Sequence, residues 1–411
     1  MSKRFLFFCA ACISCLGSLA QKPVEITPVT DTVQKIDIIH GDRLGFSKRD
    51  TNNIVQFAAG KVAARQETTL FNSDSAVLNQ KQRLFEAFGN VHINDNDSTH
   101  TYAQYMRYYF AKKLAILQKN VSLTDGKSIL TTQELEYDMN QKVGIYKKGG
   151  KVVNGQSVLT STEGTYYADL KDVFFRKKVV LVDPKYKLYA DSLLYNTETE
   201  IATFIGPTTI IDSSGREIVT SEGFYDTKNR IASFLGRPEI RDPKARTLVR
   251  GDELFTDDKT GISTIRGHGV YIDSAQGVSM LAGYMVHDRK TNTMLGTLSP
   301  LMIIKQDDDS IYVTADTLFS GLLSNLQSRD SLATDSLTTK DTLRRVTVSA
   351  NNAQNDTIRY FQGYHNVRIF SDSLQAVSDS LFYSGRDSIF KLFKDPVVWA
   401  SGSQITGDTI Y

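Results

Sequence analysis

The chain has 411 residues, 41% of them hydrophobic, which is enough for two or three compact domains or for one long repetitive domain. Its 48 basic and 46 acidic residues nearly balance, and without Lys3 and Arg4 in the first twenty residues 46 of each remain. This balance argues against a general electrostatic grip on nucleic acid, so we expect no nucleic-acid partner. The aromatic and β-branched content argues against global disorder.

The first twenty residues have the features of a secretory signal peptide. A short basic start is followed by an apolar run and by small residues, which predicts cleavage after Ala20. The run is shorter than the ~20 apolar residues that a spanning helix needs, so an uncut membrane anchor is the weaker alternative. A lipoprotein lipidated on Cys15 is a third interpretation, although Cys12 stands where an aliphatic residue is usual. We therefore expect the chain to be exported, with association with the outer or inner membrane left open.

The three cysteines, Cys9, Cys12 and Cys15, all lie in this leader. The mature chain would have none, so its stability must come from burial and backbone pairing rather than from disulfides. Thiol catalysis and cysteine-based metal sites are excluded with them.

A repeat of 29 to 30 residues dominates the rest of the chain. The stretches from Lys187 to Asp212 and from Glu217 to Asp242 share one pattern of apolar strand, Tyr, polar turn, apolar strand, Gly and Asp. We take the residue that closes the first strand as the anchor of each repeat; the anchors are Phe46, Leu78, Tyr108, Tyr137, Tyr166, Tyr195, Tyr225, Phe255, Val286, Phe319, Tyr383 and Tyr411. Such a period indicates a repeat architecture.

The offsets within a repeat predict its local structure. Seven and nine residues after the anchor, and again thirteen and fifteen after it, apolar residues alternate with polar ones, which is typical of strands with one buried face. Eleven after the anchor stands Gly or Lys, where we expect a kink: Gly89, Lys119, Lys177, Gly206, Gly236 and Lys394. Seventeen after it stands an Asx residue that can close a turn: Asp95, Asp125, Asn154, Asp183, Asp212 and Asp242.

Each repeat is therefore predicted to form two strands, joined by turns too short for parallel crossovers. The fold class is all-β, an elongated antiparallel jelly roll built of hairpins. Residues 102–117 look helical by propensity alone, but we let the repeat register overrule that. The predicted organisation is a signal peptide (1–20), a linker (21–36), repeats (37–323), a polar flexible insertion (324–357) and further repeats (358–411), the last of them half written.

The repeat resembles that of the OstA/LptA family of organic solvent tolerance proteins. Ala190-Asp191 with Tyr195, then Gly89-Asn90-Val91, carry the family pattern, and Lys119-Asn120-Val121 keeps two of its three residues. The resemblance extends from about Gly41 to Tyr411. It implies a V-shaped periplasmic β-jelly roll whose apolar interior carries the acyl chains of lipopolysaccharide towards the outer membrane, and whose open edges pair with other jelly-roll transport components. The chain differs in having more repeats than the small bridge proteins and no large C-terminal barrel.

The predicted lipid groove consists of inward residues at the repeat offsets. Acyl chains need an apolar cover to cross an aqueous compartment, because transfer of each CH₂ group out of water is favourable by about 0.8 kcal/mol. The expected groove lining is Val91, Ile93, Val121, Leu123, Val179, Leu181, Phe204, Ile210, Phe234 and Ile240. A plain packed β core is the alternative for the same residues.

The sequence does not favour an enzymatic function. The six histidines have no metal-ligand spacing, and G-x-S-x-G and P-loop motifs are absent, so we predict no catalytic residue, metal or cofactor. The basic pairs at 112–113, 147–148 and 177–178 could meet lipid phosphates, but solvated edge charges are more common. The function predicted is a periplasmic lipid-binding bridge in lipopolysaccharide transport. A partner-binding β-repeat protein without lipid, and more distantly a β-helical glycan enzyme, remain alternatives.

The chain stops at Tyr411 with an unreturned strand, so we expect either a longer natural protein or an open edge. An open edge predicts end-to-end self-association, which proline at Thr409 or Ile410 should weaken.

Overall fold

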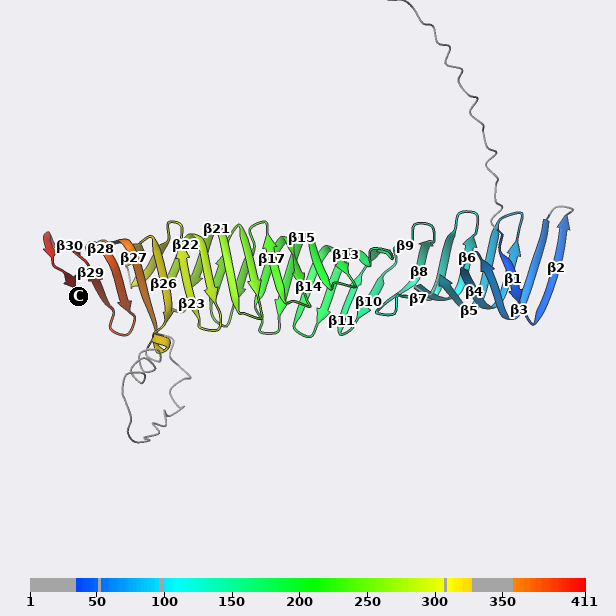
Figure 1. Ribbon diagram of the computed structural model, residues 1–411, viewed down its shortest axis with the longest axis horizontal. Helices are drawn as coiled ribbons and strands as arrows, with labels where there is room; N and C mark the ends of the chain where they lie inside the picture. The colour runs from blue at the N-terminus through cyan, green and yellow to red at the C-terminus, as the bar shows by residue number, and fades with distance from the viewer. Residues whose placement is uncertain (1–34, 51–52, 96–98, 307–308, 327–357) are drawn as a thin grey trace, which may run out of the picture. The chain divides into compact units, whose positions relative to one another are not determined.

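The computed structural model describes residues 35–50, 53–95, 99–306, 309–326 and 358–411 (Figure 1). The predicted signal peptide, nearly all of the 21–36 linker and most of the 324–357 insertion lie outside these residues. Within the described residues, 32 strands join into one sheet, and the pairings are antiparallel along its whole length. The described helical residues are 323–326. The predicted all-β antiparallel fold is confirmed.

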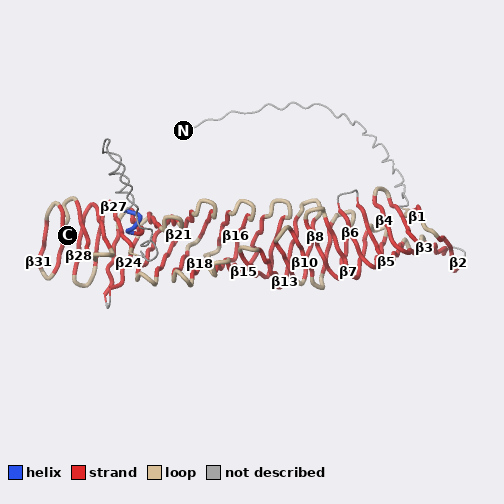
Figure 2. The backbone as a smooth tube through the Cα atoms, turned by 90° about the horizontal axis from the view of Figure 1, so that it is seen from below, coloured by secondary structure: helices blue, strands red, loops and turns tan. Residues whose placement is uncertain are grey.

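The strands follow one another in chain order (Figure 1), and the loops gather along the two edges of the strand stack (Figure 2). The first strands are β1 (Asp37–His40), β2 (Arg43–Asp50), β3 (Asn53–Gln66), β4 (Thr69–Asn79), β5 (Leu84–Asp95), β6 (Thr99–Tyr109), β7 (Leu114–Thr124), β8 (Ser128–Asp138), β9 (Val143–Tyr146), β10 (Gly150–Asn154), β11 (Ser157–Ser161) and β12 (Glu163–Tyr167). Next come β13 (Asp172–Asp183), β14 (Tyr186–Asn196), β15 (Ile201–Asp212), β16 (Glu217–Asp226), β17 (Ile231–Leu235), β18 (Glu239–Asp242), β19 (Thr247–Arg250), β20 (Glu253–Asp257), β21 (Ile262–Asp273) and β22 (Val278–Asp288). The last are β23 (Thr293–Thr297), β24 (Leu301–Gln306), β25 (Asp309–Thr314), β26 (Thr317–Leu322), β27 (Arg359–Phe370), β28 (Leu374–Ser384), β29 (Ile389–Phe393), β30 (Val397–Ala400), β31 (Ser403–Thr406) and β32 (Thr409–Ile410).

The building unit is a long strand that bends at its centre. In β3, β5, β7, β13, β15, β21 and β27 the pairing register shifts there, and in some repeats two short strands take the place of one long strand. β9 and β10, for example, both pair with β8. The two halves of successive strands therefore form two arms, joined along the line of bends.

Left-handed backbone makes the bend. Gly89 and Asn90 have φ of 71° and 45°, and a Cβ on Gly89 would come within 2.3 Å of the Asp74 carboxylate. Lys119 and Asn120 adopt the same conformation, with φ of 66° and 55°, although such angles are unfavourable for most side chains. The six predicted kink positions, Gly89, Lys119, Lys177, Gly206, Gly236 and Lys394, all have positive φ, so the predicted kink is confirmed.

Acidic side chains accept hydrogen bonds from the left-handed residues at the bend of the neighbouring strand. Asp74 accepts a hydrogen bond from Asn90 Nδ2 at 2.9 Å, and Glu163 accepts one from Lys177 Nζ at 2.6 Å. The Asp379 carboxylate does the same for Lys394 Nζ at 2.9 Å. These contacts offset part of the cost of the left-handed residues, and they give the acidic residues of the repeat a structural role.

Two rows of inward side chains run through the sheet, one on each arm, and every neighbour in a row is a cross-strand partner. The first row is Leu78, Phe85, Tyr108, Ala115, Tyr137, Gly144, Tyr166, Val173, Tyr195, Ala202, Tyr225, Ala232, Thr256, Ser263, His287, Met294, Ser320, Phe361, Tyr383 and Phe390. The second row is Phe71, Ile93, Thr101, Leu123, Leu130, Val152, Leu159, Leu181, Leu188, Ile210, Ile218, Ile240, Val249, Tyr271, Met280, Met302, Val313, Ile369, Ala376, Val398 and Ile405.

The segment 102–117, which looks helical by propensity, is strand, as the repeat register predicts. It forms most of β6 and the start of β7, and Met106, Tyr108, Ala115 and Leu117 alternate into the core. Burial of this face across two strands outweighs the local helical preference.

Tyrosines hold the two arms together in the first half of the sheet. The Tyr108 ring lies 5.0 Å from the Phe71 ring on the opposite row. The Tyr166 hydroxyl donates to Asp125 Oδ2 at 3.3 Å, and Asn154 Nδ2 donates to the Tyr195 hydroxyl at 3.1 Å. Burial raises the pKa of Tyr195 to about 12, so its hydroxyl stays protonated. Two of the Asx residues seventeen after the anchors, Asp125 and Asn154, thus make ties across the interior.

Candidate functional site

The first row loses its aromatic residues between β20 and β22. The anchors predicted there, Phe255 and Val286, stand one residue before the row, and the row positions are Thr256 and His287. Phe255 is 39% exposed and does not face the core. Phe319 is displaced in the same way, because Ser320 occupies the row. The spacing from Tyr225 is therefore 31 residues rather than 30, and small or polar side chains replace the tyrosine.

The sequence does contain the signal for this register. Gly267 stands eleven residues after Thr256, and Asp273 stands seventeen after it. Gly267 has the left-handed φ, 68°, that marks the bend in other repeats. This regularity is hard to detect in the sequence, because the residue next to Thr256 is Phe255, which is aromatic like most of the other anchors.

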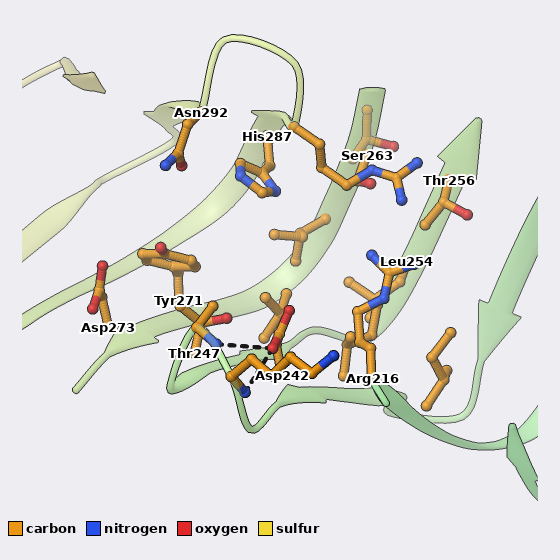
Figure 3. Close-up of a pocket in the computed structure, with 18 of the residues that line it drawn as sticks. Arg216, Asp242, Thr247, Leu254, Thr256, Ser263, Tyr271, Asp273, His287 and Asn292 are labelled. Atoms are coloured by element: carbon orange, nitrogen blue, oxygen red, sulfur yellow. Dashed lines mark hydrogen bonds between the residues drawn. The ribbon is translucent and has the colours of Figure 1, made fainter. Parts of the chain in front are cut away.

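A cavity of about 590 Å³ opens between the arms where the tyrosines are missing. The second row supplies one wall with Ile218, Ile240, Val249 and Tyr271, and the first row supplies the facing wall with Thr256, Ser263 and His287. Figure 3 shows Tyr271, His287 and Arg216 around this opening. The interior is therefore accessible here, unlike the closely packed interior of the preceding repeats.

A second cavity, of about 490 Å³, adjoins the first. The two share Arg216, Ile218, Thr256 and Arg289 as lining residues. Its apolar wall is Ile210, Ile218, Tyr225, Ala232 and Phe234. Both cavities have an apolar floor that continues the core, so hydrocarbon could enter without leaving an apolar surface.

Basic residues outnumber acidic ones around both cavities. The first is lined by four basic residues, Arg216, Lys244, Arg289 and Arg359, and two acidic ones, Asp242 and Asp273. The second is lined by five basic residues, Lys185, Arg216, Arg230, Arg289 and Lys290, and two acidic ones, Asp212 and Asp258. An anionic group would be attracted to this rim.

Ion pairs position two of the arginines. Arg216 Nε lies 2.9 Å from Asp212 Oδ2, and Arg289 Nη2 lies 2.7 Å from Asp258 Oδ1. Burial of the Asp212 carboxyl opposes its charge, but hydrogen bonds from Ser214 and the charge of Arg216 outweigh this and lower its pKa. The Asp212 carboxyl therefore stays charged at neutral pH.

His287 is neutral at physiological pH. Burial lowers its pKa to about 4, and the nearby positive charges of Arg359 and Arg289 act in the same direction. Arg359 donates from Nε to Ser320 Oγ at 2.9 Å and from Nη2 to the Asn292 carbonyl at 3.0 Å, so it closes one end of the first cavity. Burial also raises the pKa of Tyr271, to about 12.

The ten predicted groove residues all face one interior. Nine are buried members of a single hydrophobic core, and Ile240 packs against it. Ile210 and Phe234 line the second cavity and Ile240 lines the first. The other seven, Val91, Ile93, Val121, Leu123, Val179, Leu181 and Phe204, are at most 2% exposed. Their shared direction is as expected, and their contact with lipid stays a prediction.

One lysine of each basic pair considered for lipid phosphates pairs with a glutamate of the protein. Lys113 bonds Glu67 at 2.8 Å, Lys148 bonds Glu134 at 3.0 Å, and Lys177 bonds Glu163. They belong to the bends and edges, away from the cavities.

Neither a metal-ligand cluster nor a membrane-spanning helix occurs in the part of the chain that the structure describes. No group of three or more histidine, cysteine, aspartate or glutamate residues could hold a metal ion there. Among the same residues, no helix is long and apolar enough to cross a membrane.

A protein family and a set of solved structures are similar to parts of this chain. Residues 33–191 match the family described as OstA-like protein. Among solved structures, the chain is similar to LptH, described as the LptA homologous periplasmic component of the conserved lipopolysaccharide transport device from Pseudomonas aeruginosa. That similarity has 14% identity and a TM-score of 0.24, and it covers 25% of this chain and 79% of LptH. A comparison with curated proteins finds no match. The predicted resemblance to the OstA-like family is confirmed over residues 33–191.

Proposed function

We propose that the protein is a periplasmic lipid-binding bridge that takes part in lipopolysaccharide transport and outer-membrane assembly. The observation that carries this proposal is the pair of unbroken inward rows, which open into two apolar-floored cavities at β16–β22. The OstA-like match over residues 33–191 supports it.

The acyl chains of the lipid would lie between the two rows. A chain of a dozen carbons gains about 0.8 kcal/mol for each CH₂ removed from water, so a continuous apolar path lets it move without re-exposure. The cavities offer a place where such a chain enters or leaves, and their basic rim suits an anionic headgroup. Catalysis has no part in this proposal.

Partners of the bridge would pair with its outer edges. β2 carries the exposed Leu44 and Phe46 at one end, and β31 carries the exposed Ile405 at the other. Exposed strand edges with apolar side chains recruit further strands, from other jelly-roll components or from a second copy of this chain.

One observation favours a second candidate. Seven of the ten predicted groove residues are closed off from solvent, which suits a structural or partner-binding β-repeat protein without lipid cargo. Mass spectrometry of an organic extract of the purified protein separates the two. Lipid at near-stoichiometric amounts supports the bridge, and a lipid-free protein that also takes up no added acyl probe contradicts it.

A further inference from the structure

The three arginines of the second cavity have hydrogen-bond donors that the protein leaves unused. Arg216 bonds Asp212 through Nε, and within the described residues neither of its terminal nitrogens makes a hydrogen bond. Arg289 bonds through Nε and Nη2, which leaves Nη1 without a partner in the same residues. Both side chains are 25% exposed, so each guanidinium can still be approached from the cavity.

Arg230 is the least satisfied of the three. Its Nε is buried and has no hydrogen-bond partner in the described structure, and its side chain makes no ion pair there. Its position is held by backbone bonds, from its N–H to the Asp226 carbonyl at 2.8 Å and from the Asp258 N–H to its own carbonyl at 3.0 Å. A buried guanidinium nitrogen without a partner is costly, and a bound anion would offset that cost.

Charge and shape at this point agree on the kind of ligand. Arg216 and Arg289 line both cavities, whereas Arg230 lines the second, beside Phe234 and Tyr225. A guanidinium presents its donors in a planar fork that matches phosphate oxygens, and three of them around one opening suit a doubly charged group. The apolar floor starts directly beside them, with Ile218 shared by both cavities.

We infer that Arg216, Arg230 and Arg289 form a phosphate cradle at a lateral port, which binds the headgroup of a phosphorylated amphiphile while its chain lies along Ile218 and Ile240. This inference rests on the proposed lipid-binding function and adds two things to it: the three residues that hold the headgroup phosphate, and a side entrance at β16–β22 in place of passage from end to end alone.

Titration with three probes tests the cradle. They are dodecyl phosphate, dodecyl maltoside and inorganic phosphate, and they separate the headgroup from the chain. The wild-type protein should bind dodecyl phosphate at least tenfold more tightly than dodecyl maltoside, and inorganic phosphate weakly. Arg230→Gln should remove most of that preference while the affinity for dodecyl maltoside stays the same. Because Arg230 makes no ion pair within the described residues, this change leaves no carboxylate there uncompensated.

Two further variants guard the interpretation. Arg216→Lys keeps the charge and the Asp212 pair but loses the fork, and should weaken dodecyl phosphate selectively, by severalfold. Arg107→Gln is the matched control. It removes an exposed arginine of β6, which pairs with Glu86 of β5, and the variant should bind all three probes as the wild type does. Thermal unfolding checks that each variant is folded.

The outcomes distinguish this inference from the proposed function. Equal wild-type affinity for the two detergents, or an unchanged preference in Arg230→Gln, would overturn the cradle and leave lipid binding intact. Equal affinity for inorganic phosphate and dodecyl phosphate would show a free-phosphate site and overturn the port. Failure of both detergents to bind would overturn the lipid-binding function and the cradle with it.

Discussion

Refilling the first row with tyrosine should close the site. Thr256 lines both cavities and occupies a position where five earlier repeats, from Tyr108 to Tyr225, place a tyrosine. Tyr166 and Tyr195 tie the arms together from equivalent positions. Thr256→Tyr therefore restores the pattern of the closed repeats, and we expect the variant to fold at least as stably as the wild type.

The loss of binding can be worked from the added atoms. Tyrosine has five more heavy atoms than threonine, which would displace about four methylene groups of a bound chain. At ~0.8 kcal/mol each, the affinity for an acyl chain falls by about 3 kcal/mol, or roughly a hundredfold. His287→Tyr, two positions further along the row, should act in the same direction.

Displacement of a fluorescent acyl-chain probe measures this loss, with urea unfolding as the check on folding. Thr203→Tyr is the matched control, because Thr203 faces outward on β15 between the inward Ala202 and Phe204. It adds the same atoms away from the cavities and should bind as the wild type does. If folded Thr256→Tyr keeps wild-type affinity, the chain does not lie between the rows at this point and the reasoning fails.

Three other changes test the fold and the site. His287 has a pKa of about 4 in the folded protein and an ordinary value of 6.5, so the unfolded chain binds more protons between these values and stability falls as pH falls from 6.5 to 4. By urea unfolding, the wild type should therefore lose stability relative to His287→Gln across this window, and a stability difference that stays constant across it would refute the argument. Leu181→Ala, at a fully buried site, should cost about 2–5 kcal/mol by urea unfolding, and a loss under about 1 kcal/mol would contradict the packed interior. Gly89→Ala should destabilise more than Gly215→Ala, since both have positive φ but only the first meets a carboxylate; equal melting temperatures would count against the bend.

Most of the fold could be predicted because apolar and polar side chains alternate in the same way in each repeat. The inward positions of Val91, Ile93, Val121 and Leu123 follow from period-two patterning at constant offsets, and long-range pairing then overrides the helical propensity of 102–117. The kink at Gly89 follows from its residue type as well as from its offset in the repeat. Lys119 has the same left-handed backbone, but a lysine disfavours that conformation, so only its offset in the repeat predicts it.

The site could not be predicted in the same way. Its cavities depend on which side chains face each other across the two arms, and that changes when the row shifts by one residue from Phe255 to Thr256. The positions of Gly267 and Asp273 in the sequence are consistent with this shift, but the aromatic Phe255 favours the wrong residue as the anchor. The arginines come from the turns before and after β16, the turn after β22 and the start of β27, and their convergence depends on tertiary structure that no local motif encodes.

Site-specific photo-crosslinking tests the central claim most directly, because it reports where lipid lies. A crosslinking residue at Ile240, in the wall of the first cavity, is compared with one at Glu239, its neighbour on the opposite face of β18. After exposure to lipopolysaccharide and irradiation, mass spectrometry should find lipid adducts at position 240 and few at 239. Equal labelling at the two positions, or none at 240, would contradict a lipid path through the interior.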